Sequence, residues 1–312
     1  MPGIATHHIF GIEAHRALPE LIGKTQSCRE AFLLGNLGPD PFFYLAVSPA
    51  WQQYRRLGSR MHTQNPTGLL DAVHAHLVAS PSASPVTKAY ALGFLCHYLL
   101  DSHVHPLVYA QQFALGNGGV EGLPFEGAWL HRSIHATIET EIDEYQLTRK
   151  LGQTAATYRP HVHMLCCSAE ALAEISQSIA GALNRAYGID APSGLFATAV
   201  ELNRIGQRLL DSKGSGLRGR IDFFKPLGYS VSYLRALSHS GAPRDHTMFA
   251  NDDHLPWPHP YEPGKVFDAS FDELYDRAFQ KALAIMPAFC GTGFDAEGCR
   301  QVTQGVNFLG RG

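Results

Sequence analysis

Residues 88–112 read KAYALGFLCHYLLDSHVHPLVYAQQ, and Ser84-Pro85 stands just before them. Apolar residues lie around much of the circumference when this stretch is drawn as a helix, which is typical of a helix at the centre of a bundle. Serine is a good N-cap and proline is tolerated in the first helical turn, so Ser84-Pro85 marks the start. The stretch therefore predicts a central helix around which the rest of the chain packs.

On both sides of this helix, apolar residues recur at spacings of three and four, and no sustained alternation of apolar and polar residues is found. Asn65-Pro66 predicts a helix that ends near Ser80-Pro81. After a glycine-rich loop at 115–127, helices are predicted at about 128–150, 168–187, 194–212 and 270–286. The predicted fold class is all-α, a multi-helix bundle.

Composition places the chain among globular proteins. Of 312 residues, 45% are hydrophobic and 17% are charged, which suffices for a sizeable core. Lys and Arg number 25 against 28 Asp and Glu, so no broad positive field is available for duplex nucleic acid. The unusual count is histidine, at 17, because histidine binds metals and moves protons near neutral pH.

The first residues show no secretory signal, which predicts a cytoplasmic location; a different start would allow a secreted or periplasmic one. The most apolar stretch, 89–100, is too short to span a bilayer, so no transmembrane segment is expected. The six cysteines form no CxxC pair, which argues against a cysteine zinc site. Cys290 and Cys299 flank a short loop and could pair in an oxidising compartment.

The first candidate metal motif lies within the central helix. His97 and Asp101 are four residues apart, so they share a helical face and can grip one ion. His105 continues this face, but a rise of about 12 Å over eight residues means that His97 and His105 would serve two ions. Pro106 is expected to loosen the turn that holds His103 and His105. The alternative is a polar seam of hydrogen-bonded histidines.

A second motif repeats the same spacing. His135 and Glu139 lie four residues apart on the next predicted helix, and histidine with carboxylate is a common half-site for zinc. His131 extends the row as a ligand, a supporting residue or a surface residue. A solvated helix face is the alternative, but two half-sites on neighbouring helices can project inward together.

Further candidates lie at predicted loops or helix ends. Asp40 stands between two prolines, is expected in an extended turn that cannot cap a helix, and so needs another role. The other pieces are Thr6-His7-His8, Arg60-Met61-His62 and Asn251-Asp252-Asp253-His254. Residues two apart face different sides of a helix, so four histidines are expected on the surface: His74, His76, His161 and His163.

In this order, His7, the GxxGPDPFFY stretch with Asp40, Arg60-Met61-His62, HYLLDxxxHP and HxxxE resemble the zinc-dependent phospholipase C family. The resemblance covers roughly residues 1–145. Segments beyond it, NDDHxPWxHP and SFDELY, are similar to the C-terminal part of uncharacterised bacterial relatives.

The resemblance implies an all-helical domain with two or three zinc ions that hydrolyses phosphodiester bonds. It implies that His62, His97 and Asp101 hold one zinc, that His105, His135 and Glu139 hold a second, and that Asp101 bridges toward a third near His7. Asp40 is implied as the general base beside the attacking water or as a further ligand. The roles of His8, His103 and His131 stay open. Pro41 follows Asp40 where the bacillary enzyme has an aromatic residue, so choline specificity is not implied.

The leading hypothesis is therefore a zinc-dependent phosphodiester hydrolase of phospholipase C type. Its expected substrate is a phospholipid or small phosphodiester, with peripheral membrane contact where the substrate is a lipid. One alternative is a single-strand nuclease or 3′-nucleotidase of the same zinc fold, which the weak basic character of the chain disfavours. The other alternative is a non-catalytic helical scaffold in which the metal only stabilises the bundle.

We expect one domain over residues 1–312. Residues 1–150 carry the metal site, 151–239 form supporting helices, and 240–312 comprise an irregular proline-rich segment, a final helix and a tail. Five prolines between Ser240 and Lys265 exclude a helix there. Trp257 and Tyr261 make that segment too aromatic for a free linker, so it is expected to lie against the bundle.

Overall fold

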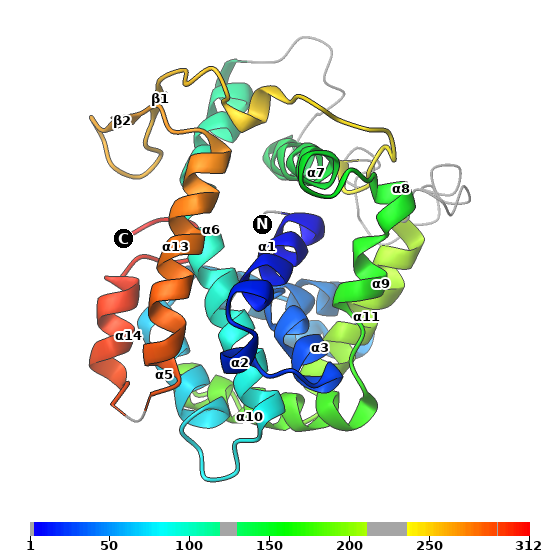
Figure 1. Cartoon of the computed structure of the whole chain (residues 1–312), viewed down its shortest axis with the longest axis vertical. Helices are drawn as coiled ribbons and strands as arrows, with labels where there is room; N and C mark the ends of the chain where they lie inside the picture. The colour runs from blue at the N-terminus through cyan, green and yellow to red at the C-terminus, as the bar shows by residue number, and fades with distance from the viewer. Residues whose placement is uncertain (1–2, 119–129, 211–235, 292) are drawn as a thin grey trace.

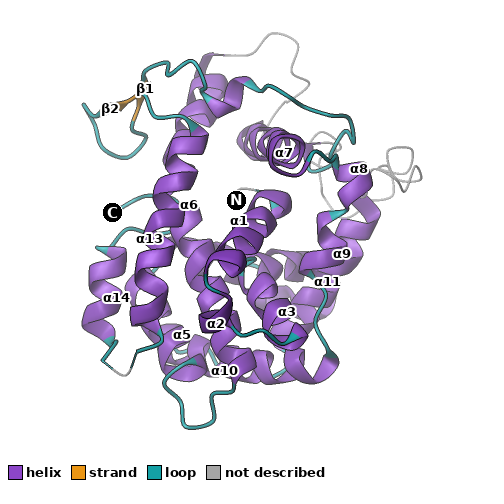
Figure 2. Cartoon of the chain, viewed as in Figure 1, coloured by secondary structure: helices purple, strands orange, loops and turns teal. Residues whose placement is uncertain are grey.

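The computed structural model describes residues 3–118, 130–210, 236–291 and 293–312. These residues are mostly helical with almost no strand, which confirms the all-α prediction (Figure 1 and Figure 2). The α-helices are α1 (Ile4–Ala17), α2 (Pro19–Ile22), α3 (Gln26–Gly35), α4 (Leu57–Thr63), α5 (Pro66–Leu77), α6 (Pro85–Gly118), α7 (Leu130–Leu151), α8 (Ala155–Tyr158), α9 (Pro160–Met164), α10 (Ala169–Tyr187), α11 (Leu195–Leu210), α13 (Phe271–Phe289) and α14 (Ala296–Thr303). The other elements are the 3-10 helices η1 (Asp40–Val47), η2 (Pro49–Tyr54) and η5 (Met248–Ala250), and the strands β1 (Trp257–Pro258) and β2 (Val266–Phe267).

The predicted central helix is α6. Its hydrophobic residues from Ala89 to Leu100 are at most 3% exposed, and α3, α7 and α13 pack along it (Figure 1). Pro106 lies inside α6, and the helix continues through it to Gly118. The expected loosening at Pro106 therefore does not interrupt the helix.

Two glycines let α3 approach α6 closely. A Cβ at Gly35 would lie 2.2 Å from the Tyr90 carbonyl oxygen, and one at Gly93 would lie 2.1 Å from the Phe32 carbonyl oxygen. Such backbone contact leaves no space for a side chain at either position. The close packing brings the turn after α3 against the middle of α6.

Helix starts follow the predicted capping. The Asn65 side chain accepts a hydrogen bond from the Gly68 amide at the start of α5, with Pro66 in the first turn. At α13, Ser270 and Glu273 form a reciprocal capping box. The other predicted helices also form, as α7, α10 and α11.

The proline-rich segment lies against the bundle. It contains only the short η5 and a two-residue antiparallel pairing in which Trp257 faces Phe267. Phe249 and Trp257 are each 7% exposed, and the Trp257 indole donates to the Ala269 carbonyl. The finer division of the chain into 1–150, 151–239 and 240–312 stays a prediction, and most of the glycine-rich loop at 115–127 lies outside the described residues.

Three positions differ from the sequence expectations. Asp40 does not lie in an extended turn but begins the 3-10 helix η1, because the fixed φ of Pro41 suits the first turn of a helix. His74 is buried rather than on the surface, since α13 and the turn after it cover that side of α5. His161 is buried because α9 packs against α1.

Cys290 and Cys299 are free thiols in the structure rather than a disulfide. None of the described helices has the length and the apolar composition needed to cross a membrane.

Candidate metal centre

The N-terminal helix α1 brings His7 into the core. Asp143 of α7 accepts hydrogen bonds from the Ala5 amide at 3.0 Å, the Thr6 amide at 2.8 Å and the Thr6 hydroxyl at 2.6 Å. These bonds satisfy amides that the first turn of a helix otherwise leaves without partners. The first turn of α1, and His7 with it, is thereby fixed to α7.

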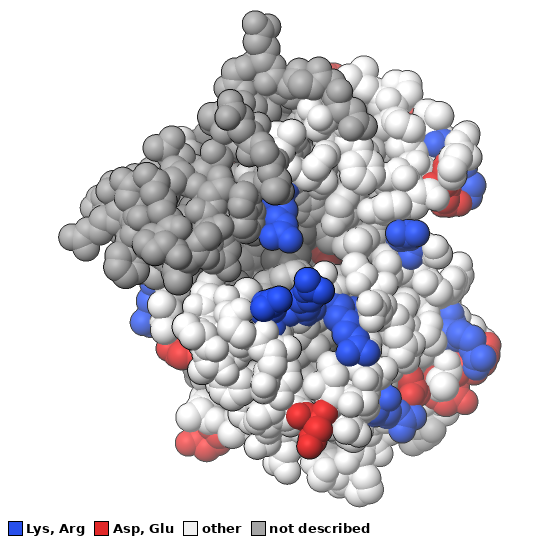
Figure 3. All heavy atoms as spheres, turned by 180° about the vertical axis from the view of Figure 1, so that it is seen from behind, with Lys and Arg blue, Asp and Glu red and all other residues white. Residues whose placement is uncertain are grey.

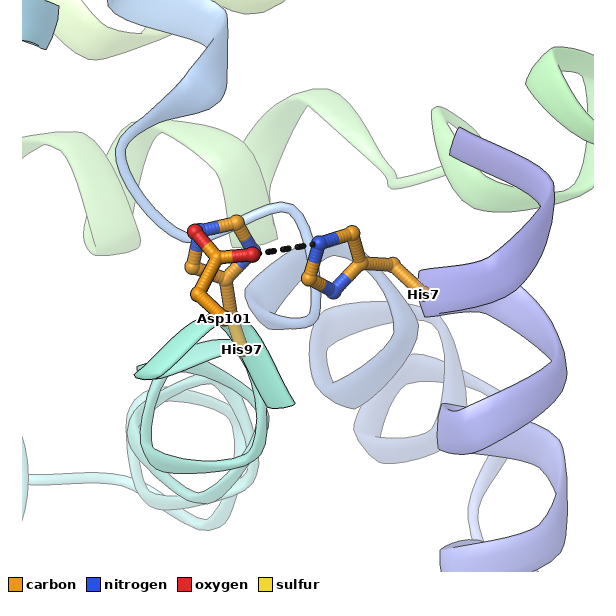
Figure 4. A group of neighbouring side chains, drawn as sticks. All are labelled: His7, His97 and Asp101. Atoms are coloured by element: carbon orange, nitrogen blue, oxygen red, sulfur yellow. Dashed lines mark ion pairs between the residues drawn. The ribbon is translucent and has the colours of Figure 1, made fainter. Parts of the chain in front are cut away.

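Asp101 is the centre of the cluster. Its Oδ1 lies 3.2 Å from His7 Nε2, and its Oδ2 lies 3.2 Å from His97 Nε2, one turn earlier in α6. Figure 4 shows the imidazole of His7 reaching from α1 toward the carboxylate on α6. Asp101 Oδ2 also lies 3.8 Å from both His62 Nε2 and His105 Nδ1. Its carboxylate thus has histidines on several sides while being 0% exposed.

Asp40 joins this cluster from the start of η1, directly after the turn that follows α3. Its Oδ1 lies 3.1 Å from His62 Nε2 and 3.7 Å from His97 Nε2. Gly38, with φ of +48°, makes the approach feasible, because a Cβ there would lie 2.4 Å from His97 Cδ2. Asp40 is 4% exposed, so its carboxylate is largely withdrawn from water.

The second half-site joins α6 to α7. Glu139 Oε1 lies 2.9 Å from His135 Nε2 and 3.6 Å from His105 Nε2. All eight candidate residues therefore fall into three groups whose ligand atoms lie within 4.8 Å of one another: His7, His97 and Asp101; Asp40, His62 and His97; His105, His135 and Glu139. The last group has the membership expected from sequence, whereas His97 takes part in both of the others.

The family model for zinc dependent phospholipase C matches residues 6–188. This span is more than half of the chain and contains all eight residues of the cluster. The chain belongs to this family. Members of the zinc-dependent phospholipase C family are hydrolases that use zinc, and the family name implies a lipid substrate. No curated protein and no solved structure gives a significant match to the chain.

In this family member, hydrogen bonds hold three histidines of the centre each in one orientation. His62 Nδ1 lies 2.7 Å from the Gly58 carbonyl oxygen, His97 Nδ1 3.0 Å from that of Asn36, and His105 Nδ1 2.6 Å from that of Phe308. A carbonyl oxygen only accepts, so each Nδ1 donates, and in the neutral imidazole the lone pair is then on Nε2. Anchoring of one ring nitrogen in this way is typical of histidines that bind metal through the other.

The candidate ligand atoms also fit zinc because several of them lack a hydrogen-bond partner. Within the described part of the chain, His7 Nε2, His97 Nε2, His105 Nε2 and both oxygens of Asp101 are buried without a hydrogen-bond partner. Buried polar atoms are seldom left so, and imidazole with carboxylate is a common ligand set for zinc. These residues therefore fit the cofactor of the family.

Burial and neighbouring charges set the protonation of the cluster. Burial lowers the pKa of His7, lowers that of His105 to about 3, and lowers that of His135 well below its ordinary value. Burial opposes the ionisation of Asp101, but His97 and His105 outweigh it and hold the Asp101 pKa well below its usual range. His97 differs, because Asp101 and Asp40 outweigh burial and raise its pKa. Neutral imidazoles around an ionised carboxylate are the forms that bind metal.

Several singled-out residues lie outside the three groups. His8 points away and shares a 2.8 Å hydrogen bond with the Tyr158 hydroxyl, and His103 Nδ1 contacts the Leu99 carbonyl at 2.7 Å. His131 is exposed. His254 contacts the Asp268 carbonyl, and the preceding Asp252 accepts from Tyr145.

Sequence reasoning missed the residues that orient the ligands. Gln112 is one of them, and its amide oxygen lies 2.7 Å from His135 Nδ1. The sequence could have indicated it, since Gln112 follows His105 by two helical turns on the same face. The backbone carbonyls of Asn36, Gly58 and Phe308 could not be predicted as partners, because every residue has a carbonyl group.

Proposed function

We propose that the chain is a zinc-dependent phosphodiester hydrolase of phospholipase C type, with a phospholipid or small phosphodiester as substrate. The observation that carries this proposal is the meeting of four ligand-bearing segments around Asp101. Each segment supplies an imidazole or carboxylate that lies within 3.8 Å of another residue of the cluster. The four segments are α1, the start of η1 with Asp40, α4 and α6. α7 adds the third group beside them.

The proposed zinc ligands follow this geometry. His105, His135 and Glu139 would hold one ion, and His62, His97 and Asp101 a second. His7 and Asp101 would contribute to a third. Bound zinc lowers the pKa of an attacking water and neutralises charge that builds on the phosphoryl oxygens.

Asp40 is the proposed general base. Its Oδ1 lies 3.1 Å from His62 Nε2, so the carboxylate stands beside the atom through which His62 would bind zinc. The carboxylate would receive the proton of the attacking water and orient that water toward the phosphorus. Burial helps here, because few competing waters reach a group that is 4% exposed.

Partly exposed aromatic side chains lie beside two of the three ligand groups and could contact an apolar part of the substrate. Phe43 is partly exposed and its ring centroid lies 5.0 Å from that of His62. Tyr109, also partly exposed, lies 4.8 Å from the His135 ring. By contrast, Phe42 and Trp257 are buried in the core and are not available as a substrate wall.

An anionic substrate also agrees with the charge distribution. On the face opposite to the view of Figure 1, several Lys and Arg side chains stand near the middle of the view, and an acidic side chain is visible among them (Figure 3). Cationic side chains on a surface attract a negatively charged diester, although the whole chain carries a net charge of −3.

The test compares zinc-loaded wild type with Asp40→Asn on phospholipids of several head groups, a chromogenic phosphodiester and single-stranded oligonucleotides. We expect the wild type to release a phosphorylated head group, and Asp40→Asn to lose about 10²–10⁴-fold in kcat while keeping most of its zinc. Turnover of the oligonucleotides alone would favour the nuclease alternative. No turnover of any substrate by protein with full zinc would leave only a structural role for the metal.

A further inference from the structure

Residues 306–311 form a short loop that contacts ligand histidines from a part of the chain beyond the family match at 6–188. The Phe308 carbonyl accepts the 2.6 Å hydrogen bond from His105 Nδ1, and the Phe308 amide donates to the His62 carbonyl at 3.2 Å. The centroid of the Phe308 ring lies 5.2 Å from that of His62 and 5.8 Å from that of His97. One buried residue therefore contacts histidines from all three ligand groups and from two helices, since His97 belongs to two of the groups.

The 306–311 loop is itself well fixed. The Asn307 side chain accepts from the Leu309 amide at 2.9 Å and the Arg311 amide at 3.2 Å, and its Nδ2 donates to the Thr63 carbonyl. The Tyr98 hydroxyl donates to the Val306 carbonyl at 2.8 Å. The loop is thus closed on itself and bonded to both α4 and α6.

Gly310 seats the loop on α6. Its φ is +73°, and a Cβ there would lie 2.4 Å from Pro106 Cγ and 3.1 Å from the Ser102 carbonyl oxygen. Pro106 has no N–H, so it leaves the carbonyl four residues earlier without its usual helical partner. The loop therefore lies against the turn of α6 in which Pro106 leaves the Ser102 carbonyl without its helical partner, directly after His105.

We propose that Phe308 is a positioning residue for the metal centre, acting through its carbonyl on His105 and through its ring on His62 and His97. The inference rests on the proposed function, since it assumes that these histidines bind zinc through Nε2. Phe308 fixes the tautomer and the ring plane of His105, and it sets the spacing between α4 and α6. The 306–311 loop thereby joins the Asp40–His62–His97 group to the His105–His135–Glu139 group.

The experiment measures zinc affinity with a competing chelator and the visible absorption of the cobalt-substituted protein. Two variants displace the loop without altering a ligand. Gly310→Ala places a methyl group against Pro106, and Phe308→Ala removes the ring while keeping the backbone amide and carbonyl. Phe308→Leu is the conservative variant, and Phe289→Ala is the control, because Phe289 is 0% exposed and packs instead against His74 and Phe294.

We expect Gly310→Ala and Phe308→Ala to hold at least one zinc about 10–100-fold more weakly, the usual effect of losing a residue that orients a ligand. Their cobalt spectra should change, and Phe308→Leu should restore most of the affinity. Phe289→Ala should lower the melting temperature but leave the zinc affinity and the cobalt spectrum unchanged.

Wild-type metal affinity and spectra in both loop variants would overturn the positioning role, whatever their melting temperatures. An equal loss of affinity in Phe289→Ala would overturn it too, since general loosening of the core would then be sufficient. A wild-type chain that binds neither metal would overturn the proposed function as well, so the two failures are distinguishable.

Discussion

Asp101 Oδ1 of α6 and His7 Nε2 of α1 lie 3.2 Å apart in the buried centre (Figure 4). The His7 ring also stacks on that of His97, with centroids 4.2 Å apart. These contacts join the first helix of the chain to the central one. Since Asp143 fixes the first turn of α1 to α7, three helices determine where His7 lies.

Replacing His7 by Ala should remove about one zinc ion per chain and lower kcat/KM at least about tenfold, because one imidazole ligand is lost. His8→Ala is a matched control, since His8 is equally buried at 1% exposed but bonds to Tyr158 outside the cluster. Elemental mass spectrometry of both variants gives the zinc content. Full zinc in His7→Ala, or equal losses in the two variants, would contradict the placement of His7 in the centre.

Gln112→Leu should weaken zinc binding at the His105–His135–Glu139 group about 10–100-fold, because the acceptor for His135 Nδ1 is removed. Gln112→Glu should preserve the affinity, since a carboxylate also accepts from Nδ1. Gln111→Leu controls for the change in side chain, because Gln111 bonds to the Phe249 carbonyl and to no ligand of the centre. Competition with a chromophoric chelator gives the three affinities. A Gln112→Leu value equal to wild type would show that Gln112 does not orient His135.

Gly93→Ala should cost about 1–3 kcal/mol or more in the free energy of unfolding. The new methyl group would lie 2.1 Å from the Phe32 carbonyl oxygen and force α3 away from α6. That movement also displaces the Asn36 carbonyl from His97 Nδ1, so zinc affinity should fall together with stability. Gly194→Ala, where a Cβ meets nothing within 4 Å, should change stability by less than about 0.5 kcal/mol. Urea unfolding of zinc-loaded proteins measures both, and a neutral Gly93→Ala would rule out the close packing of these helices.

The helices could be predicted because their determinants are local. Capping residues such as Asn65 and Ser270 act within one turn, and the apolar run of α6 shows its burial in composition alone. Asp40 was predicted in the wrong local conformation, because the rule that disfavours helix before proline does not hold at the first turn of η1. His74 was placed on the surface because spacing within one helix says nothing about which later segment covers it.

The candidate ligands could be predicted from spacing for the same reason. His97 with Asp101 and His135 with Glu139 each form a pair within one helix, so the pairing needs no tertiary information. Tertiary packing decides the rest. How α3 packs against α6 determines that two groups share His97 and that Asp40 approaches beside Gly38. The role proposed for Phe308 depends on a contact between distant segments, which no local pattern shows.

The last prediction concerns stability in acid. His74 packs against the rings of Phe289 and Phe294, with centroid distances of 5.1 and 5.2 Å, and burial lowers its pKa from 6.5. In the unfolded chain it has an ordinary pKa, so below about pH 6.5 the unfolded state binds a proton that the folded state does not. The free energy of unfolding should therefore fall as the pH drops through this range, and it should be unaffected by His74 at higher pH.

His74→Leu removes this contribution, so its free energy of unfolding should fall less than that of wild type between pH 7.5 and pH 5. One group contributes at most about 1.4 kcal/mol per pH unit, which bounds the difference between the two slopes. Urea unfolding of both zinc-saturated proteins across this range measures it, and subtracting the curves cancels the acid sensitivity of the metal centre, which they share. Parallel curves would mean that His74 binds its proton equally well in the folded and unfolded chains, and would contradict its burial against the two phenylalanines.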